Sequence, residues 1–340
     1  MKAAVFHEFG GVEKIRYEDF PEPKIKTGEV LIKVKACALN HLDIWERQGL
    51  PGVTLPHISG SDVAGFVEAV DSSVEWLKKG DEVIVSPGIS CMKCSKCLSG
   101  DDNQCSQYNI LGYRNNGGYA EYVSVPAVNV LLKPPNLTFE EAASIPLVFI
   151  TAWHMLVTRA NIKPGDNVLI QAGGSGVGIA AIQIAKLFNA NVITTVGSDD
   201  KIEKAMALGA DHVINYRKQD FEKEVKKITD NKGVDIVIDH IGPDVWDKDI
   251  KSLSVNGRLV TCGSTSGPSA NIDLRYVFSR HLSILGSYMG RKSELLELLK
   301  FIESGKLKPV VHKVFALKEA GMAQQEMLDR KNFGKIVLVV

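Results

Sequence analysis

Four cysteines lie within the stretch GISCMKCSKCLSGDDNQC, with two, two and seven residues between them. This spacing is typical of a metal site rather than of a disulfide framework, and the other two cysteines, Cys37 and Cys262, stand alone. Tetrahedral zinc is the expected occupant, and four thiolates would close its coordination sphere. Such a zinc fixes a loop and takes no part in catalysis. An iron–sulfur cluster is the alternative, but no accompanying electron-transfer motif is present. The predicted ligands are Cys91, Cys94, Cys97 and Cys105.

A second motif, GGSGVG, follows an apolar run and opens a helical pattern. In this context glycines let the backbone approach a dinucleotide pyrophosphate, and the helix N-terminus supplies N–H donors. The strict G-x-G-x-x-G spacing has Ser175 at its middle position, with Gly174 and Gly176 beside it. A tight turn without a ligand is the alternative. The predicted cofactor-binding residues are Gly173, Gly174, Ser175, Gly176, Val177 and Gly178.

The next strand-like run, NVITTV, bears on the choice of nicotinamide cofactor. It ends in Gly197 and Ser198, with Lys201 close behind. NAD sites commonly place an acidic residue at this point to bind the ribose hydroxyls. Asp199 and Asp200 come too late for that role, and a lysine is available to pair with a 2′-phosphate. The sequence therefore favours NADPH over NADH, with Gly197, Ser198 and Lys201 as contacts.

The elements that must position these motifs follow two patterns. The first 130 or so residues contain short strand-like runs at 2–6, 29–36, 64–70, 81–86 and 119–126, separated by glycine and proline. A helical pattern then covers 139–157. From residue 166 onward strands and helices alternate, with strands predicted at 167–172, 191–196, 212–216, 234–241, 258–263 and 282–289. These six strands predict a doubly wound parallel sheet. The final GKIVLVV is expected to fold back onto the first domain.

Composition excludes several classes of function. Forty basic residues balance forty acidic ones, so the chain lacks the overall positive charge that would attract it to nucleic acid or to an anionic membrane. No apolar run of about 20 residues is present, and the N-terminus does not resemble a signal peptide. We expect a cytoplasmic protein that acts on a small molecule, without nucleic-acid or membrane partners.

The motifs together resemble the medium-chain dehydrogenase/reductase superfamily, which includes zinc alcohol dehydrogenases and quinone oxidoreductases. The resemblance covers nearly the whole chain and rests on EVLIKVKACALNHLD, LPHISGSDVAGFVEAV, GDEVIV, the cysteine lobe, GGYAEYVSVP, GGSGVG and FGKIVLV. It implies an α/β protein with a GroES-like β-rich catalytic domain at 1–149 and 287–340, including a zinc lobe at 88–108. A Rossmann domain would occupy 150–286. The resemblance also implies a homodimer or homotetramer, joined near the sixth strand.

The departures from the family pattern concern the catalytic zinc. Where zinc alcohol dehydrogenases carry a cysteine, this chain has Asn40, and the proton-relay hydroxyl two residues later is replaced by Leu42. Ser61 replaces the histidine ligand, and Leu147 falls at the third ligand position. An amide, a hydroxyl and an aliphatic side chain do not hold zinc tightly. One structural zinc per chain is therefore expected.

Without a Lewis acid, the remaining chemistry is hydride transfer to an acceptor that is already electrophilic. Quinones and α,β-unsaturated carbonyls are the acceptors that the zinc-free branch of the family reduces. Asn40 would donate its amide to the acceptor oxygen, although a turn-end asparagine bonding its own backbone is the alternative. Arg47 is predicted to orient the substrate, unless it is an exposed helix arginine. His57 and Tyr113 are candidate proton donors, and water is a third.

The resemblance also assigns residues to the cofactor. Thr151 would pack beside the nicotinamide and take part in catalysis, whereas Tyr216 and Arg330 would flank the adenosine phosphate. The nicotinamide end would contact Gly263, Ser264, Leu285, Gly286 and Ser287.

Two other interpretations stay open. A zinc-dependent alcohol dehydrogenase with relocated ligands would draw on His41, Asp43 and Asp62. A non-catalytic protein that keeps only the zinc lobe, whether a nucleic-acid binder or a crystallin-like structural protein, is the second. Two zinc ions per chain would favour the former, and failure of NADPH to raise the melting temperature would favour the latter.

Overall fold

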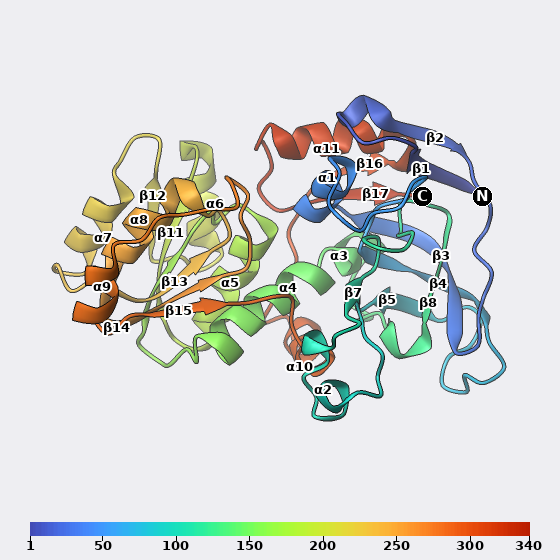
Figure 1. Cartoon of the computed structure of the whole chain (residues 1–340), viewed down its shortest axis with the longest axis horizontal. Helices are drawn as coiled ribbons and strands as arrows, with labels where there is room; N and C mark the ends of the chain where they lie inside the picture. Colours follow the sequence, from blue (N-terminus) through green and yellow to red (C-terminus); the bar gives the residue numbers. More distant parts are fainter. The chain divides into compact units, whose positions relative to one another are not determined.

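The computed structural model describes all 340 residues, which form two compact units. One unit comprises Met1–Leu147 together with Arg291–Val340, and the other comprises Val148–Gly290 (Figure 1). Each unit encloses its own cluster of buried apolar side chains, as expected of a domain. No helix is both long enough and apolar enough to cross a lipid bilayer.

The first unit is built on a seven-stranded sheet with the order β16-β17-β3-β4-β5-β9, in which β8 also pairs with β3. In β3, Val30, Ile32 and Val34 are buried while Lys33 between them is exposed, the period of two that defines a sheet face. The strands are β3 (Glu29–Ala38), β4 (Asp62–Val70), β5 (Glu82–Val85), β8 (Tyr122–Pro126), β9 (Val130–Leu132), β16 (Val311–Ala316) and β17 (Lys335–Val339). β17 runs antiparallel to β3, which confirms that the C-terminal segment folds back.

Two small sheets and several helices complete this unit. The sheets are β1 (Lys2–Phe6) with β2 (Ile15–Asp19), and β6 (Gly88–Ile89) with β7 (Asn109–Ile110). The α-helices are α1 (His41–Arg47), α2 (Ser95–Leu98), α3 (Phe139–Ala143), α10 (Lys292–Glu303) and α11 (Ala320–Leu328). Short 3₁₀ turns are η1 (Val12–Lys14), η2 (Asp102–Gln104), η3 (Ala127–Asn129) and η6 (Leu317–Glu319).

The expectation of one helical stretch over 139–157 is wrong in one respect. Thr138 caps α3 by accepting a hydrogen bond from the Glu141 N–H at 3.2 Å, but α3 ends at Ala143. A new helix, α4 (Pro146–Trp153), then begins and passes into a π-helix over His154–Arg159. Pro146 causes the break because proline has no N–H to donate and disfavours helical backbone at the residue before it.

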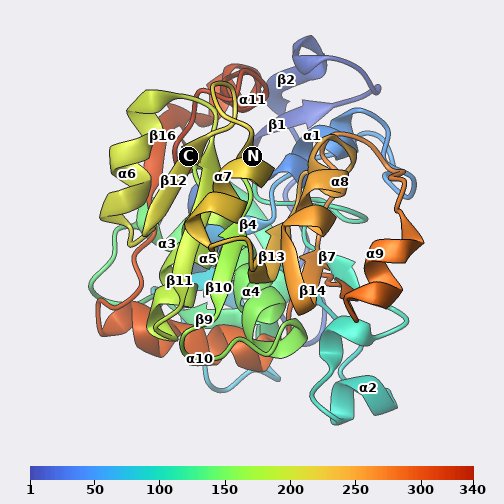
Figure 2. The same ribbon diagram turned by 90° about the vertical axis from the view of Figure 1, so that its left-hand side faces the viewer.

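The second unit contains the predicted six-stranded parallel sheet, in the order β12-β11-β10-β13-β14-β15 (Figure 1 and Figure 2). This is the doubly wound dinucleotide-binding order, whose chain reversal falls between β10 and β13. The strands are β10 (Asn167–Ile170), β11 (Asn191–Val196), β12 (His212–Asn215), β13 (Val234–Asp239), β14 (Leu253–Thr261) and β15 (Ser283–Gly286). The helices are α5 (Gly176–Leu187), α6 (Ile202–Ala207), α7 (Phe221–Ile228), α8 (Pro243–Ser252) and α9 (Leu274–Ser279), with the 3₁₀ turn η5 (Asp199–Lys201) before α6.

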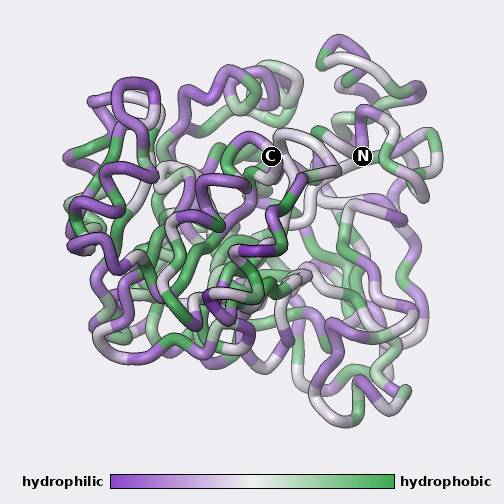
Figure 3. The backbone as a smooth tube through the Cα atoms, turned by 60° about the vertical axis from the view of Figure 1, so that its left-hand side comes forward, coloured by the Kyte–Doolittle hydropathy of each residue, from purple (hydrophilic) through white to green (hydrophobic).

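Hydropathy follows this architecture. The backbone coloured by hydropathy is mostly hydrophobic along the central strands and mostly hydrophilic along the outer loops (Figure 3). Leu169, Val237 and Leu259, from three neighbouring strands, are fully buried. Continuous apolar strands of this kind are expected where helices cover both faces of a parallel sheet.

Candidate active site and metal centre

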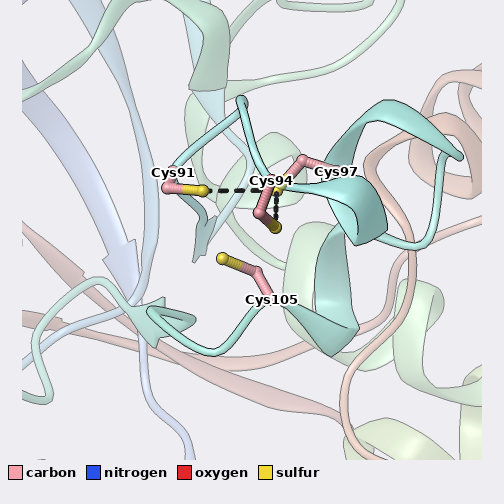
Figure 4. Close-up of side chains that lie close together, drawn as sticks. All are labelled: Cys91, Cys94, Cys97 and Cys105. Atoms are coloured by element: carbon pink, nitrogen blue, oxygen red, sulfur yellow. Dashed lines mark hydrogen bonds between the residues drawn. The ribbon is translucent and has the colours of Figure 1, made fainter.

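The four lobe cysteines converge on one point (Figure 4). All four Sγ atoms lie within 4.8 Å of one another, with 3.9 Å between Cys91 and Cys97 and 3.5 Å between Cys94 and Cys97. Zinc–thiolate bonds of about 2.3 Å place tetrahedral sulfurs about 3.8 Å apart, so the site fits zinc. Backbone N–H groups of Lys93 and Cys94 lower the pKa of the Cys91 thiol to about 6, which favours the thiolate that a metal requires.

The lobe is tied to the C-terminal part of the same unit. Arg291 pairs with Asp101 at 2.6 Å, and the Lys292 N–H donates to Asp102 Oδ1 at 3.0 Å. The Lys292 ammonium also donates to Asn129 Oδ1 at 3.0 Å. The start of α10 therefore holds the loop that carries the cysteines, which suits a structural metal.

A second polar cluster lies where three neighbouring strands of the first unit end or begin. Asn40 follows β3, Asp62 opens β4, and Lys335 opens β17. The register pairs Ala38 with Asp62 on one side of β3 and with Val337 on the other. This pairing brings together residues that are far apart in the sequence.

The hydrogen bonds of this cluster are well defined. The Lys335 ammonium donates to the Leu39 carbonyl and to Asn40 Oδ1, each at 2.6 Å, and to Asp62 Oδ2 at 3.0 Å. Asn40 Nδ2 donates to Asp62 Oδ2 at 3.0 Å. The Leu147 N–H donates to Asp62 Oδ1 at 2.8 Å. The positions of Asn40 and Leu147, which the resemblance equates with zinc ligands, thus meet around Asp62.

The buried carboxyl group of Asp43 binds the backbone of Asn40, and the buried Glu46 lies near Asp43. Asp43 Oδ2 accepts from the Asn40 N–H and from the Tyr119 hydroxyl, each at 2.7 Å. Burial raises the pKa of Asp43 to about 6 and also raises the pKa values of Glu46 and Tyr119. Asp43 Oδ2 is therefore occupied by Asn40 and Tyr119, whereas Asp43 Oδ1 is buried without a hydrogen-bond partner.

The candidate metal ligands of the alternative interpretation do not gather. The four lobe cysteines are the one group of three or more His, Cys, Asp or Glu side chains close enough to share a metal. His41 opens α1 as an exposed residue, its ring 6.1 Å from that of Trp45. His41, Asp43 and Asp62 therefore form no metal site. Ser61, the remaining position equated with a zinc ligand, is buried and its hydroxyl has no hydrogen-bond partner.

The interpretation of Arg47 as an exposed helix arginine is wrong. Its side chain is 1% exposed, and its guanidinium donates to Gln324 Oε1 at 2.7 Å and to the Gly10 carbonyl. These partners hold α1 against other parts of the first unit. The role of Arg47 in orienting a substrate stays a prediction. The candidate proton donors are likewise engaged, since His57 Nε2 contacts the Gly112 carbonyl and the Tyr113 hydroxyl donates to the Pro51 carbonyl, both at 2.6 Å.

The glycine-rich turn lies between β10 and α5, at the carboxyl end of the parallel sheet. Ser175 caps α5 by accepting from the Gly178 N–H at 3.0 Å, and its hydroxyl also contacts His240 Nε2 at 3.0 Å. A Cβ at Gly173 would lie 2.3 Å from Thr194 Oγ1, and one at Gly178 would lie 2.3 Å from the Ala172 carbonyl oxygen. Both glycines are therefore required sterically. Gly174 lies in the turn, and Gly176 and Val177 are the first two residues of α5.

The expected 2′-phosphate contacts lie after β11. A Cβ at Gly197 would lie 2.8 Å from Tyr216 Oη, so these two residues are in contact range. Ser198 precedes η5, whose last residue is Lys201. Burial lowers the pKa of Lys201, the nearby Asp200 carboxylate opposes this shift, and the Lys204 and Arg217 cations lower the pKa further. Asp199 accepts from Asn215 Nδ2 at 2.6 Å and from Lys218, which keeps its carboxylate occupied.

The remaining cofactor positions fall in both units. Thr151 is buried in α4. Gly263 and Ser264 follow β14, Leu285 and Gly286 end β15, and the Ser287 N–H donates to the Thr261 carbonyl at 2.9 Å. Arg330 follows α11 in the first unit with a left-handed φ of 56°. These assignments stay predictions.

No sequence pattern identified Lys335, Tyr119 or His240 as a residue of the site. The one pattern that could have identified Lys335 is a single lysine at the start of the otherwise apolar strand KIVLV. Tyr119 and His240 carried no comparable signal, because only the tertiary structure shows what their side chains contact.

A zinc lobe on a β-rich unit and a glycine-rich turn on a doubly wound sheet define a class: oxidoreductases that use a nicotinamide cofactor. Residues 26–135 match the family model of the alcohol dehydrogenase GroES-like domain, and residues 176–304 match that of the zinc-binding dehydrogenase. The chain is 35% identical to an NAD-dependent alcohol dehydrogenase of Sulfolobus acidocaldarius over the full length of both. It is 30% identical to the quinone oxidoreductase of Homo sapiens, covering 100% of this chain and 98% of that protein.

A solved structure of an NAD-dependent alcohol dehydrogenase is 48% identical and superposes with a TM-score of 0.97 over the whole of both chains. The chain belongs to the medium-chain dehydrogenase/reductase superfamily, which confirms the resemblance, the GroES-like domain and the Rossmann sheet. The relatives include alcohol dehydrogenases, quinone oxidoreductases and a crotonyl-CoA carboxylase/reductase, and so the residues of the site must decide among these activities.

Proposed function

We propose that this protein is an NADPH-dependent reductase of quinones or α,β-unsaturated carbonyl compounds that works without a catalytic metal. The observation that carries the proposal is the environment of Asn40. This residue stands where zinc-dependent relatives of the superfamily have a thiolate ligand, and its amide is bonded to the Lys335 ammonium and to Asp62.

The donor set near Asn40 does not fit zinc. Asn40, Ser61 and Leu147 offer an amide, a hydroxyl and an aliphatic group, none of which is a common zinc ligand. Asp62 is a carboxylate, but one of its oxygens accepts from Lys335 and Asn40 and the other accepts from the Leu147 N–H. An ammonium group already held at this point opposes a second cation by charge repulsion. No catalytic step is therefore assigned to a metal.

The remaining groups suit an electrophilic acceptor. When bound, the reduced nicotinamide supplies a hydride. Negative charge then develops on the acceptor oxygen, where the Asn40 amide N–H acts as a hydrogen-bond donor. Because His57 and Tyr113 are both engaged with backbone carbonyls, we assign delivery of the proton to water.

The choice of NADPH rests on the end of β11. Gly197 places no carboxylate where an acidic residue would repel a 2′-phosphate, and Lys201 provides a cation with Lys204 and Arg217 nearby. Asp199, which could otherwise bind ribose hydroxyls, is held by Asn215 and Lys218.

The test is a screen of NADPH oxidation against quinones, alkenals and saturated aldehydes, with NADH in parallel. Asn40→Ala should lower kcat for the accepted substrate by roughly 10²–10³-fold, the effect of removing one oxyanion donor, while the Kd for NADPH is unchanged. Gln48→Ala, which removes an exposed amide just after the same helix, is the matched control. Full activity in Asn40→Ala would refute the assignment.

A second candidate is alcohol oxidation with a catalytic zinc, which is favoured by similarity to two NAD-dependent alcohol dehydrogenases at 35% and 48% identity. It requires two zinc ions per chain and activity that depends on the more exchangeable one. Metal analysis of purified protein, together with an assay of alcohols and NAD, separates the two candidates.

A further inference from the structure

The Lys335 side chain is a buried ammonium with all three of its hydrogen-bond donors in use. It is 5% exposed, and its partners are the Leu39 carbonyl, Asn40 Oδ1 and Asp62 Oδ2. Asp62 is fully buried, so the ion pair is removed from water. Pairs of this kind stabilise poorly relative to apolar residues, which raises the question of what else the lysine does.

These bonds fix the orientation of the Asn40 amide. An ammonium only donates, so the Asn40 atom 2.6 Å from Lys335 Nζ must be the oxygen. A carboxylate only accepts, so the atom 3.0 Å from Asp62 Oδ2 must be the amide nitrogen. Two independent contacts therefore select one of the two amide orientations. One N–H of Nδ2 binds Asp62, and the other has no protein partner.

The ammonium also changes the strength of that remaining donor. A cation at Oδ1 draws electron density from the amide and makes its N–H groups more positive, since hydrogen bonds in a chain polarise one another. The effect is largest where water is excluded. The Lys335 charge thus makes the Asn40 amide a stronger donor to a developing oxyanion than it would be with a neutral side chain at position 335.

We propose that Lys335 is a positioning residue for the reduction, acting through Asn40: its ammonium fixes and polarises the amide that receives the negative charge of the acceptor. The inference rests on the proposed function. According to this inference Lys335, the first residue of β17, affects the rate of hydride transfer and not only the stability of the sheet.

Three variants test the inference. Lys335→Met keeps the length of the side chain and removes its charge, and kcat should fall roughly ten- to a hundredfold with an unchanged Kd for NADPH. Asp62→Asn combined with Lys335→Met removes the unpaired carboxylate, so thermal stability should recover while kcat stays low. Asn40→Ala combined with Lys335→Met should be no slower than Asn40→Ala alone, because Lys335 is proposed to act only through the Asn40 amide. Lys306→Met, an exposed lysine of the same unit, is the control.

Wild-type kcat in folded Lys335→Met, or recovery of kcat together with stability in the Asp62→Asn combination, would overturn the inference and leave Lys335 a structural residue. If Asn40→Ala itself is fully active, the proposed function fails instead, and the two failures are distinguished. A readout independent of turnover is the ¹⁵N-labelled side-chain amide of Asn40, which should be rigid and slowly exchanging in wild type and mobile in Lys335→Met. A mobile Asn40 amide in wild type contradicts the inference directly.

Discussion

Cofactor choice offers the sharpest test of the adenosine end of the site, and the substitution is Lys201→Ala. Lys201 ends the turn η5 after β11 and is partly buried, so its ammonium is less hydrated than that of a fully exposed lysine. Lys204 and Arg217 add positive charge near Lys201, and Asp200 offsets part of it. A 2′-phosphate bound there would meet a cation already partly stripped of water.

The magnitude follows from one charge-assisted hydrogen bond. Such a bond to phosphate contributes about 1.5–3 kcal/mol, or roughly ten- to a hundredfold in affinity. The Kd for NADPH should rise by that factor in Lys201→Ala, and the Kd for NADH should stay the same. Because the second pKa of a phosphate monoester is about 6, the preference for NADPH should also shrink below that pH as the phosphate loses charge.

Gly197→Asp addresses the same preference from the opposite side. An aspartate adds repulsion against the phosphate and an acceptor for the ribose hydroxyls. Its Cβ would lie 2.8 Å from Tyr216 Oη, however, so the substitution must displace that hydroxyl. We therefore pair it with Tyr216→Phe, which removes the contacting oxygen, and expect the double variant to prefer NADH.

Fluorescence titration of both cofactors gives the dissociation constants, and Lys223→Ala, an exposed lysine of α7, is the control for loss of charge. If wild type binds NADH as tightly as NADPH, the interpretation of the β11 end is wrong. Equal weakening of both cofactors in Lys201→Ala would assign the lysine to the shared pyrophosphate or to the fold.

Three further outcomes are expected. Cys94→Ser should remove the single expected zinc and lower the melting temperature, while the Kd for NADPH in the folded fraction is unchanged. Activity that depends on a second metal ion, as measured by metal analysis, would contradict this prediction. The pKa of Asp43 is raised to about 6 in the folded protein, whereas an aspartate of the unfolded chain has a pKa of about 4. Between these two pH values Asp43 binds a proton only in the folded state, so the free energy of unfolding should fall as the pH rises from about 4 to about 6. Asp43→Asn should flatten that dependence in urea titrations, and an unchanged slope would refute it. We also propose that the protein assembles through β15, an edge strand of the parallel sheet, so light scattering at micromolar concentration should show more than the 37.1 kDa monomer.

The sequence alone determined the features that arise from local chemistry and short-range periodicity. The cysteine spacing predicted the metal cluster because all four ligands lie within fifteen residues, and one loop suffices to gather them. The alternation of apolar runs and helical patterns predicted the six parallel strands, since each strand covered on both faces must be apolar throughout. The glycine-rich turn was recognisable for the same reason, as its steric demands fall on consecutive residues.

Only the tertiary structure decided which distant side chains share a site. Lys335 and Asn40 are separated by 295 positions, and no local pattern links them; the pairing of β17 with β3 does. Arg47 is buried because α11 supplies Gln324, a partner that an amphipathic pattern in α1 does not reveal. Tyr216 meets Gly197 because β12 pairs with β11. In each case the free energy that fixes the side chain comes from contacts made after distant elements associate. For Asn40 and Gly197 these contacts depend on the register of the sheet, and for Arg47 they depend on the hydrogen bond between α1 and α11.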